Sequence, residues 1–326
     1  MTDLVGTRAP SPVSERAAAL VADRRPRAEL VGRQLAEMAG DPEAFVAGLR
    51  AGFIDLGDPA YIEGQRRVAP GIGPVLGVRW PLMEAIKRGF REETRRERTT
   101  AWLFLVDRLF REPEQEFRWF AFGLLERLVI DDPERSWQLL RRASRDAADW
   151  ITVDSLAHPC GKGVLREPYR WAELEQLVYS PSRWERRLVG STVATMPFVD
   201  HRLGRAPAVA QHGLELIASL IGDDEPDVQK ALAWALRSLT LVDGEAVTAL
   251  CEREAVRAAE TADGNRAWVV RDALPKLAED RAARIRDRLA GIRRKPGVPS
   301  TSRASRAASG FGDALSGVVM PEPPLT

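Results

Sequence analysis

The chain has 326 residues, of which 44% are hydrophobic and 29% charged, so it is long enough for a folded core and is not disordered throughout. The net charge is +1, from 48 Lys and Arg against 47 Asp and Glu, so any nucleic-acid-binding surface must be local. Two cysteines exclude a disulfide scaffold and a four-cysteine zinc site, and they favour a reducing compartment such as the cytoplasm.

The two ends of the chain differ in composition from its middle. Residues 1–28 are rich in Pro, Ser, Ala and Arg and are predicted to form a disordered N-terminal tail. Residues 292–326 are predicted to form a disordered, basic and Pro-rich C-terminal tail. From Arg293 to Arg306 this tail has five basic residues and no acidic one. It is either a solvated tail or an auxiliary phosphate-binding arm.

Between these ends, residues 29–291 are expected to form one helical domain. Leu, Ala, Arg and Glu dominate, and alternating β-branched runs are scarce. Acidic residues around a proline mark helix starts at residues 41–43, 132–134 and 225–227. Breaks are expected at residues 57–59, 70–77 and 180–182.

A weak internal repeat indicates the fold class. The segment 228–236 aligns with 270–278, 42 positions later, and with 185–193, 43 positions earlier. Residues 150–156 and 117–125 occupy the places of earlier units. A period near 40 is typical of HEAT-like helix pairs, which stack into a solenoid. The prediction is therefore an all-α, right-handed α-solenoid whose concave face binds its partner.

The usual catalytic and cofactor motifs are missing. The three histidines have no metal-ligand spacing, and His158 beside Cys160 is more simply a helix residue next to a buried thiol than a metal site. The glycine-rich segment 71–77 lacks the Lys-Ser/Thr of a phosphate loop and has no preceding strand, so it is interpreted as a linker. We expect no cofactor and no bound metal.

Tryptophan is the more informative residue type, with nine in the chain. Trp150 and Asp154 share a helix face at i,i+4, and Trp184 and Arg187 do so at i,i+3. Lys230, Trp234 and Arg237 form a second stripe at i,i+4,i+7. Any one of these tryptophans alone is more simply explained by core packing, and Asp154 alone by a helix cap or a surface ion pair. Their arrangement in successive repeats instead predicts one shared groove.

Four short motifs resemble the AlkD-like DNA alkylation repair family, bacterial DNA glycosylases built from HEAT-like repeats. They are Gly77-Val78-x-x-Pro81, Trp150-x-x-Val153-Asp154-Ser155, Ser182-x-Trp184-x-x-Arg187 and Gln229-Lys230-Ala231-x-x-Trp234-x-Leu236-Arg237. The resemblance covers residues 75–292. Asp149 departs from it, because many members have a second tryptophan there. The segment between Arg187 and Trp234 also looks several residues longer than in the family.

The resemblance implies roles for particular residues. Asp154 matches the catalytic carboxylate, which would stabilise the oxocarbenium-like sugar and hold the attacking water. Trp150 and Trp234 match the aromatic residues that flank the lesion sugar. Phosphate binding is implied for Arg187, with Lys230, Arg237 and Trp184 as further DNA contacts.

The leading hypothesis is therefore a monofunctional, monomeric glycosylase. It would hydrolyse the N-glycosidic bond of N3- or N7-alkylated purines in double-stranded DNA, in the cytoplasm at the nucleoid. Basic residues outnumber acidic ones in segments 87–111 and 183–205, as duplex binding requires. Two alternatives stay open: a DNA-binding relative without efficient excision, and a HEAT-like protein-interaction scaffold.

Overall fold

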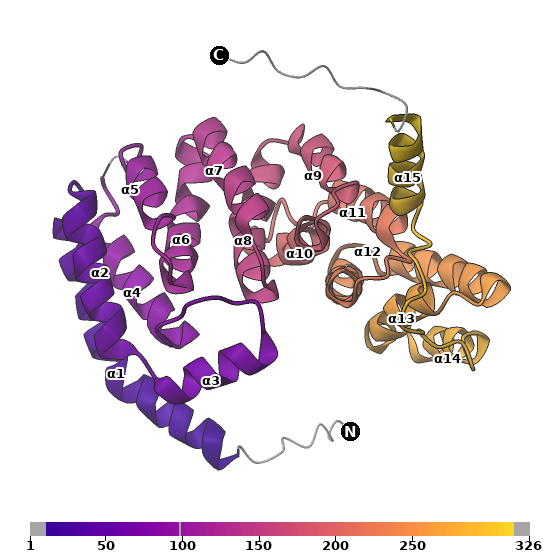
Figure 1. The fold of residues 1–326 in the computed structure, drawn as a ribbon, viewed down its shortest axis with the longest axis horizontal. Coiled ribbons are helices and arrows are strands. Elements are labelled where there is room, and N and C mark those ends of the chain that lie inside the picture. Colours follow the sequence, from indigo (N-terminus) through magenta and orange to yellow (C-terminus); the bar gives the residue numbers. More distant parts are fainter. Residues whose placement is uncertain (1–10, 98, 316–326) are drawn as a thin grey trace. The chain divides into compact units, whose positions relative to one another are not determined.

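The computed structural model describes residues 11–97 and 99–315, and the regular secondary structure within these ranges is all helical (Figure 1). It contains fifteen α-helices and one 3₁₀ turn, and the described residues form no strand. The all-α fold class is thereby confirmed and is consistent with an α-solenoid. The chain divides into two compact units, residues 1–131 and 132–326. No helix in the described part of the chain is both long and apolar enough to cross a bilayer.

The first unit is built around contacts that α1 makes with α2 and α4, while α6 contacts α4 and α5. Its core is rich in phenylalanine, with the rings of Phe45, Phe90 and Phe120 in mutual contact at centroid distances of 5.6–6.2 Å. The helices of this unit are α1 (Pro12–Glu37), α2 (Pro42–Leu56), α3 (Pro59–Val68), α4 (Trp80–Glu93), α5 (Trp102–Leu109) and α6 (Gln115–Asp131).

The prediction of a disordered N-terminal tail is wrong for residues 12–28, because α1 begins at Pro12 with Ser11 as its cap. Residues 1–10 lie outside the described residues. The helix is held by close packing against α4, which composition does not reveal. A Cβ atom on Gly32 would overlap the carbonyl oxygen of Ile86, and one on Gly89 would overlap that of Glu29. These glycines let the two backbones approach each other.

The linker interpretation of residues 71–77 is confirmed, because no helix forms between Val68 and Trp80. Glu116 of α6 holds the end of this loop, accepting hydrogen bonds from the backbone N–H groups of Leu76 and Gly77 at 3.0 and 2.8 Å. Its side chain is fully buried, and burial raises the pKa of its carboxyl group.

The second unit is a succession of helix pairs. α7 contacts α8, α9 contacts α10, and α11 contacts α12. The second helices also contact one another, α8 with α10 and α10 with α12, while the first helices α9 and α11 are in contact. The helices of this unit are α7 (Pro133–Asp146), α8 (Trp150–Arg166), α9 (Arg170–Val178), α10 (Arg183–Val199), α11 (Pro207–Leu220), α12 (Pro226–Thr261), α13 (Gly264–Ala273), α14 (Glu279–Arg288) and α15 (Arg303–Leu315).

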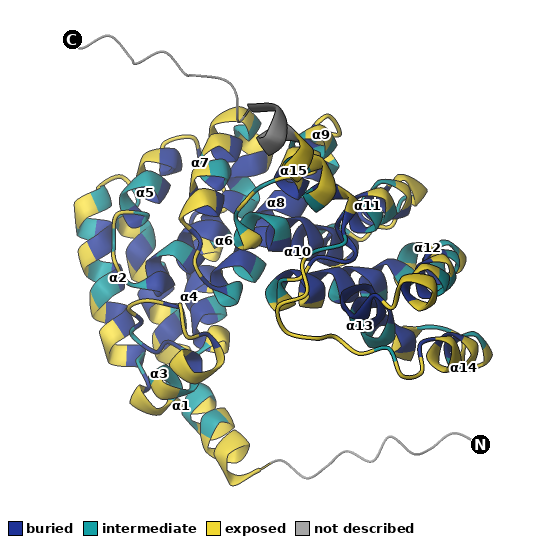
Figure 2. Cartoon of the chain, turned by 45° about the vertical axis from the view of Figure 1, so that its right-hand side comes forward, coloured by how far each residue is buried: buried dark blue, intermediate teal, exposed yellow. Residues whose placement is uncertain are grey.

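Three of the expected repeat segments, residues 150–156, 185–193 and 228–236, lie in the second helices α8, α10 and α12 of these pairs. The long helix α12 is two helices joined at Asp243, whose φ of −149° and ψ of 90° are not helical. Asp243 caps the second half, accepting a hydrogen bond from the N–H of Ala246 at 2.8 Å. The segment 270–278 is the exception, because α13 ends at Ala273 and a 3₁₀ turn with Pro275 follows. Buried residues alternate with exposed ones along the helices, as expected for amphipathic helices that pack on one another (Figure 2).

The prediction of a disordered C-terminal tail is wrong for residues 303–315, which form α15 and contact α11. The preceding extended segment is anchored as well, because the N–H of Thr301 donates to the carbonyl of Gly222 at 2.9 Å. The cause is tertiary contact, since the composition of this segment builds no core of its own. Residues 316–326 lie outside the described residues.

Candidate functional site

The carboxylate of Asp154 is positioned by the start of helix α8. Asp149 is 2% exposed and caps this helix, its Oδ1 accepting a hydrogen bond from the N–H of Thr152 at 2.9 Å. Trp150 is the first residue of the helix and Asp154 follows one turn later. The cap therefore fixes the turn that directs both side chains to one face.

Helix α10 supplies the groups that bind this carboxylate. Arg187 donates from Nε to Oδ1 of Asp154 at 3.1 Å and from Nη2 to Oδ2 at 2.7 Å, a bidentate ion pair. Ser191, one turn further along α10, donates from Oγ to the same Oδ1 at 2.6 Å. The ion pair is nearly closed to solvent on the arginine side, with side-chain exposures of 6% for Arg187 and 20% for Asp154.

Two further contacts complete the arrangement. The Nη1 group of Arg187 donates to the carbonyl of Asp227, in the first turn of α12, at 2.6 Å. The Arg187 guanidinium carbon also lies 5.9 Å from the centre of the Trp150 ring. We call Trp150, Asp154, Arg187 and Ser191 the carboxylate cluster. It joins α8, α10 and α12, and α10 approaches α12 through Gly190, where a Cβ atom would lie 2.9 Å from the backbone of Ala231.

The structure thus brings together three of the predicted site residues, Trp150, Asp154 and Arg187. Trp234 is half-buried on α12, and its place beside the cluster stays a prediction. Arg237 forms an ion pair with Asp272 and also donates to its backbone carbonyl at 2.8 Å. The expected DNA contact of Arg237 stays a prediction, and a phosphate bound there would have to share or replace Asp272 as its partner.

The remaining predicted DNA contacts lie on α10 and α12. Trp184 is half-buried, with the guanidinium of Arg183 4.7 Å from its ring centre. Lys230 is exposed and forms no hydrogen bond or ion pair with the described residues. Lys230 and Arg187 occupy equivalent repeat positions, yet one is exposed and the other buried. The repeat alignment therefore does not predict how exposed each of the two residues is.

Sequence reasoning missed Ser191 and the backbone carbonyl of Asp227. Ser191 lies four residues after Arg187, so the i,i+4 rule places both on the face of α10 that meets Asp154. That spacing was a usable signal for Ser191. A carbonyl acceptor such as that of Asp227 leaves no mark in the side-chain sequence.

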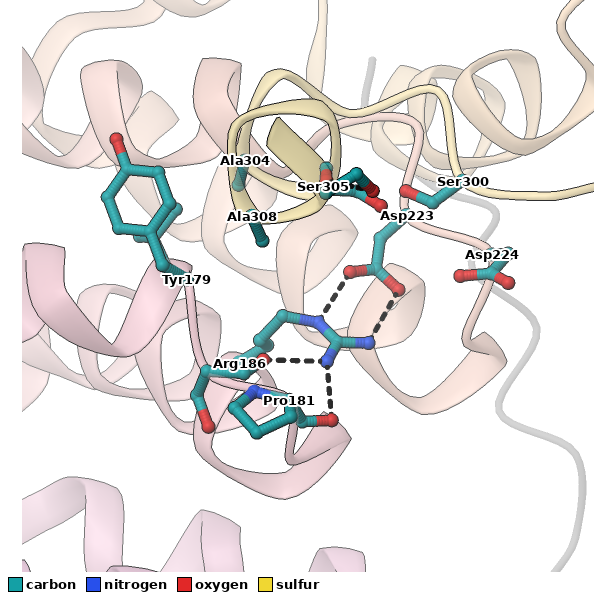
Figure 3. Close-up of a pocket in the computed structure, with 12 residues that line it drawn as sticks. Tyr179, Pro181, Arg186, Asp223, Asp224, Ser300, Ala304, Ser305 and Ala308 are labelled. Carbon is teal, nitrogen blue, oxygen red and sulfur yellow. Dashed lines mark hydrogen bonds and ion pairs between the residues drawn. The ribbon is translucent and has the colours of Figure 1, made fainter. Parts of the chain in front are cut away.

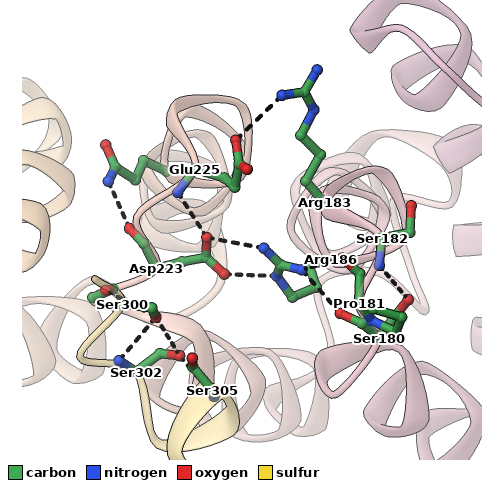
Figure 4. Close-up of polar contacts among 12 residues, drawn as sticks. Ser180, Pro181, Ser182, Arg183, Arg186, Asp223, Glu225, Ser300, Ser302 and Ser305 are labelled. Atoms are coloured by element: carbon green, nitrogen blue, oxygen red, sulfur yellow. Dashed lines mark hydrogen bonds and ion pairs between the residues drawn. The ribbon is translucent and has the colours of Figure 1, made fainter. Parts of the chain in front are cut away.

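Other cations of α10 are neutralised by acids of the second unit. Arg186 pairs with Asp223 at 2.8 Å, and Arg183 pairs with Glu225 at 3.4 Å (Figure 4). The Arg186–Asp223 pair lies in a pocket of about 420 Å³ that Tyr179, Asp224 and the start of α15 also line (Figure 3). None of the carboxylate cluster lines this pocket, so it is a feature separate from the candidate site.

The described part of the chain contains no cluster of three or more His, Cys, Asp or Glu side chains that could bind a metal ion. Cys160 is buried, and burial raises the pKa of its thiol to about 12. The thiol is therefore protonated at neutral pH, which agrees with the structural interpretation of His158 and Cys160.

Comparison with known proteins agrees with the family resemblance of the sequence motifs. The family model of the DNA alkylation repair enzymes matches residues 49–277. This match includes all of α8, α10 and α12, and hence every residue of the cluster. No curated protein matches the chain significantly. Because the family model covers well over half of its length, the chain belongs to the family of DNA alkylation repair enzymes.

Proposed function

We propose that the protein is a monofunctional DNA glycosylase that hydrolyses the N-glycosidic bond of N3- and N7-alkylated purines in duplex DNA. The observation that carries the proposal is the Asp154 carboxylate, held by Arg187 and Ser191 beside the half-buried ring of Trp150. A fixed anion beside an indole face suits a reaction in which positive charge develops.

The proposed reaction requires few catalytic groups besides this carboxylate. A purine alkylated on a ring nitrogen is a good leaving group, so departure of the base needs little acid catalysis. The barrier lies in the oxocarbenium-like sugar, and a nearby carboxylate lowers the energy of that charge. Asp154 is assigned to stabilise the sugar cation and to orient the attacking water, and Trp150 and Trp234 to flank the sugar. No step requires a cofactor.

The arrangement modifies the role expected for Arg187. Its guanidinium uses three of its five N–H groups on Asp154 and the carbonyl of Asp227. In the proposal its first task is therefore to hold Asp154 in place, and any phosphate contact uses the remaining N–H groups. The exposed Lys230 is the simpler phosphate ligand.

The direct test is the formation of abasic sites. Duplex DNA treated with a methylating agent is incubated with the protein, and abasic sites are cleaved with alkali and resolved on a denaturing gel. The proposal predicts enzyme-dependent cleavage at purines without strand nicking before the alkali step. Binding to this DNA without abasic-site formation would support the alternative of a DNA-binding relative that lacks excision.

A further inference from the structure

The chain beyond the family match contains an ordered, basic segment that is attached to the helices of the candidate site. We call residues 292–302 the C-terminal arm. Its backbone lies directly on the start of α13, where a Cβ atom on Gly264 would overlap the carbonyl oxygen of Arg293. Because the family model ends at residue 277, this arm is an addition to the matched region.

Two anchors hold the arm at its ends, one through a side chain and one through the backbone. Near its beginning, Arg294 donates to Oε1 of Gln229 at 2.8 Å and lies over the Trp268 ring at 5.6 Å. Near its end, the N–H of Thr301 donates to the carbonyl of Gly222, whose φ of +100° favours glycine. Figure 4 shows Ser300 and Ser302 beside Asp223, in the same turn as Gly222. The arm therefore has a defined path across the second unit.

The cations of the arm have no acidic partners among the described residues. Arg293 and Lys295 are exposed and form no hydrogen bond or ion pair there, and no acid occurs from Arg293 to Arg306. Arg271 beneath the arm has a lowered pKa, chiefly because it is partly buried and further because of the charge of Arg293. Like charges gathered without acids favour an anionic partner.

The position of the arm connects these cations to the carboxylate cluster. Gln229, to which Arg294 is bonded, lies in the first turn of α12 together with Asp227, whose carbonyl accepts from Arg187. The exposed Lys230 is the next residue. Since the arginines of α10 are paired with acids, Lys230 and the arm supply uncompensated charge near the first turn of α12.

We infer that the C-terminal arm is a second DNA-backbone contact, in which Arg293 and Lys295 bind phosphates of the same duplex that carries the lesion. Consecutive cations on an extended segment match a row of phosphates, and they supply affinity without reading sequence. The inference deepens the proposed function and rests on it only in taking duplex DNA as the substrate.

The test compares two double variants of the full-length protein with the same loss of charge. Arg293→Ala/Lys295→Ala removes the exposed cations of the arm, and Arg303→Ala/Arg306→Ala removes two exposed cations of α15. Affinity for an undamaged 20-bp duplex is measured at several salt concentrations, and excision is measured on the methylated duplex. All four side chains are exposed, so equal thermal midpoints are expected and are checked first.

The arm variant is expected to reduce the slope of log affinity against log salt by about one for each lost phosphate contact, hence by about two. The α15 variant should leave the slope within about 0.5 of the wild-type value, as expected where no phosphate contact is lost. Equal slopes for wild type and the arm variant, or equal reductions in both variants, would overturn the inference. The inference would also be overturned if the arm variant lost affinity for heparin but kept the wild-type affinity for duplex DNA.

The two proposals fail in different ways. If the wild-type protein binds duplex with the expected slopes but releases no base, the proposed function is wrong and the arm remains a DNA contact. If it releases alkylated base while the arm variant binds like wild type, the inference about the arm is wrong and the proposed function stands.

Discussion

Asp154 accepts three side-chain hydrogen bonds in the second unit, and these distinguish it from an acid that merely caps a helix or pairs at the surface. Arg187 supplies two of them and Ser191 the third. Asp149, five residues earlier, is the residue that caps helix α8. The two acids therefore have separate tasks, and their partners can be removed one at a time.

Replacing Arg187 with alanine should destabilise the protein by about 3 kcal/mol, because it leaves Asp154 without its partner in a poorly solvated position. Arg183→Ala is the matched control on the same helix: its pair with Glu225 is 46% and 35% exposed, and its loss should cost less than about 1 kcal/mol. Urea unfolding measures both. Equal losses would mean that the Arg187–Asp154 pair is no stronger than a surface pair.

Ser191→Ala should lower single-turnover excision about tenfold, because one hydrogen bond to the proposed catalytic carboxylate of Asp154 is lost and the orientation of this carboxylate loosens. Duplex affinity should not change. Ser155→Ala is the control, since Ser155 lies next to Asp154 but donates to the carbonyl of Ile151 in its own helix. If both serine variants excise equally fast, Ser191 does not position Asp154.

At the scale of elements, local signals in the sequence located helix starts well. Pro42, Pro133 and Pro226 each stand at the first helical position, as expected from their acidic neighbours. Helix α1 has the same kind of local signal, with Ser11 as cap and Pro12 at its first position, but the composition of residues 1–28 outweighed it in the prediction. Helix α15 was not predictable in this way, because distant contacts with α11 stabilise it. The same limit applies to the candidate site. The spacing of the motifs predicted that Asp154 and Arg187 lie close together, but the burial of Ser191 depends on how the helices pack.

The packing of α1 against α4 gives a prediction for Gly32. Gly32→Ala should cost about 1–3 kcal/mol, because its Cβ would overlap the carbonyl oxygen of Ile86. Gly64→Ala is the control in α3, where a Cβ atom meets nothing within 4 Å, and it should be neutral or stabilising by up to about 1 kcal/mol. Thermal unfolding compares the two. If Gly32→Ala is as stable as Gly64→Ala, α1 does not pack as described.

At the scale of the whole molecule, the net charge of +1 does not show how paired and unpaired charges are distributed over the chain. Many arginines in the two segments with a basic excess are paired with acids, among them Arg108 with Glu43 and Arg186 with Asp223. Counting basic residues along the sequence therefore overestimates the charge available to DNA. Unpaired cations such as Lys230 and those of the C-terminal arm are the better guide to a phosphate-binding surface.

The proposed reaction also predicts how the whole enzyme responds to a chelator. Base release should be unchanged when the protein is pre-incubated with EDTA, because a carboxylate and water suffice for a bond that alkylation has already weakened. The measurement is the rate of abasic-site formation with and without EDTA. A large loss that added Zn²⁺ restores would contradict the account and direct attention to His158.

The most direct measurement of the central claim is single-turnover release of an alkylated base by Asp154→Asn, alongside its affinity for duplex DNA. Asparagine keeps the size of the side chain and removes its charge. If Asp154 stabilises the sugar cation, excision should fall by about 10²-fold or more, since each factor of ten corresponds to about 1.4 kcal/mol of transition-state stabilisation.

Duplex affinity should hold or rise slightly, because an anion near the phosphates is gone. Asp149→Asn serves as the control, since it removes a neighbouring charge while asparagine remains a good helix cap, and it should excise at nearly the wild-type rate. A large loss of excision in Asp154→Asn, with binding intact and the control active, is the predicted result. Excision at the wild-type rate by Asp154→Asn would contradict the assignment of Asp154 as the catalytic carboxylate.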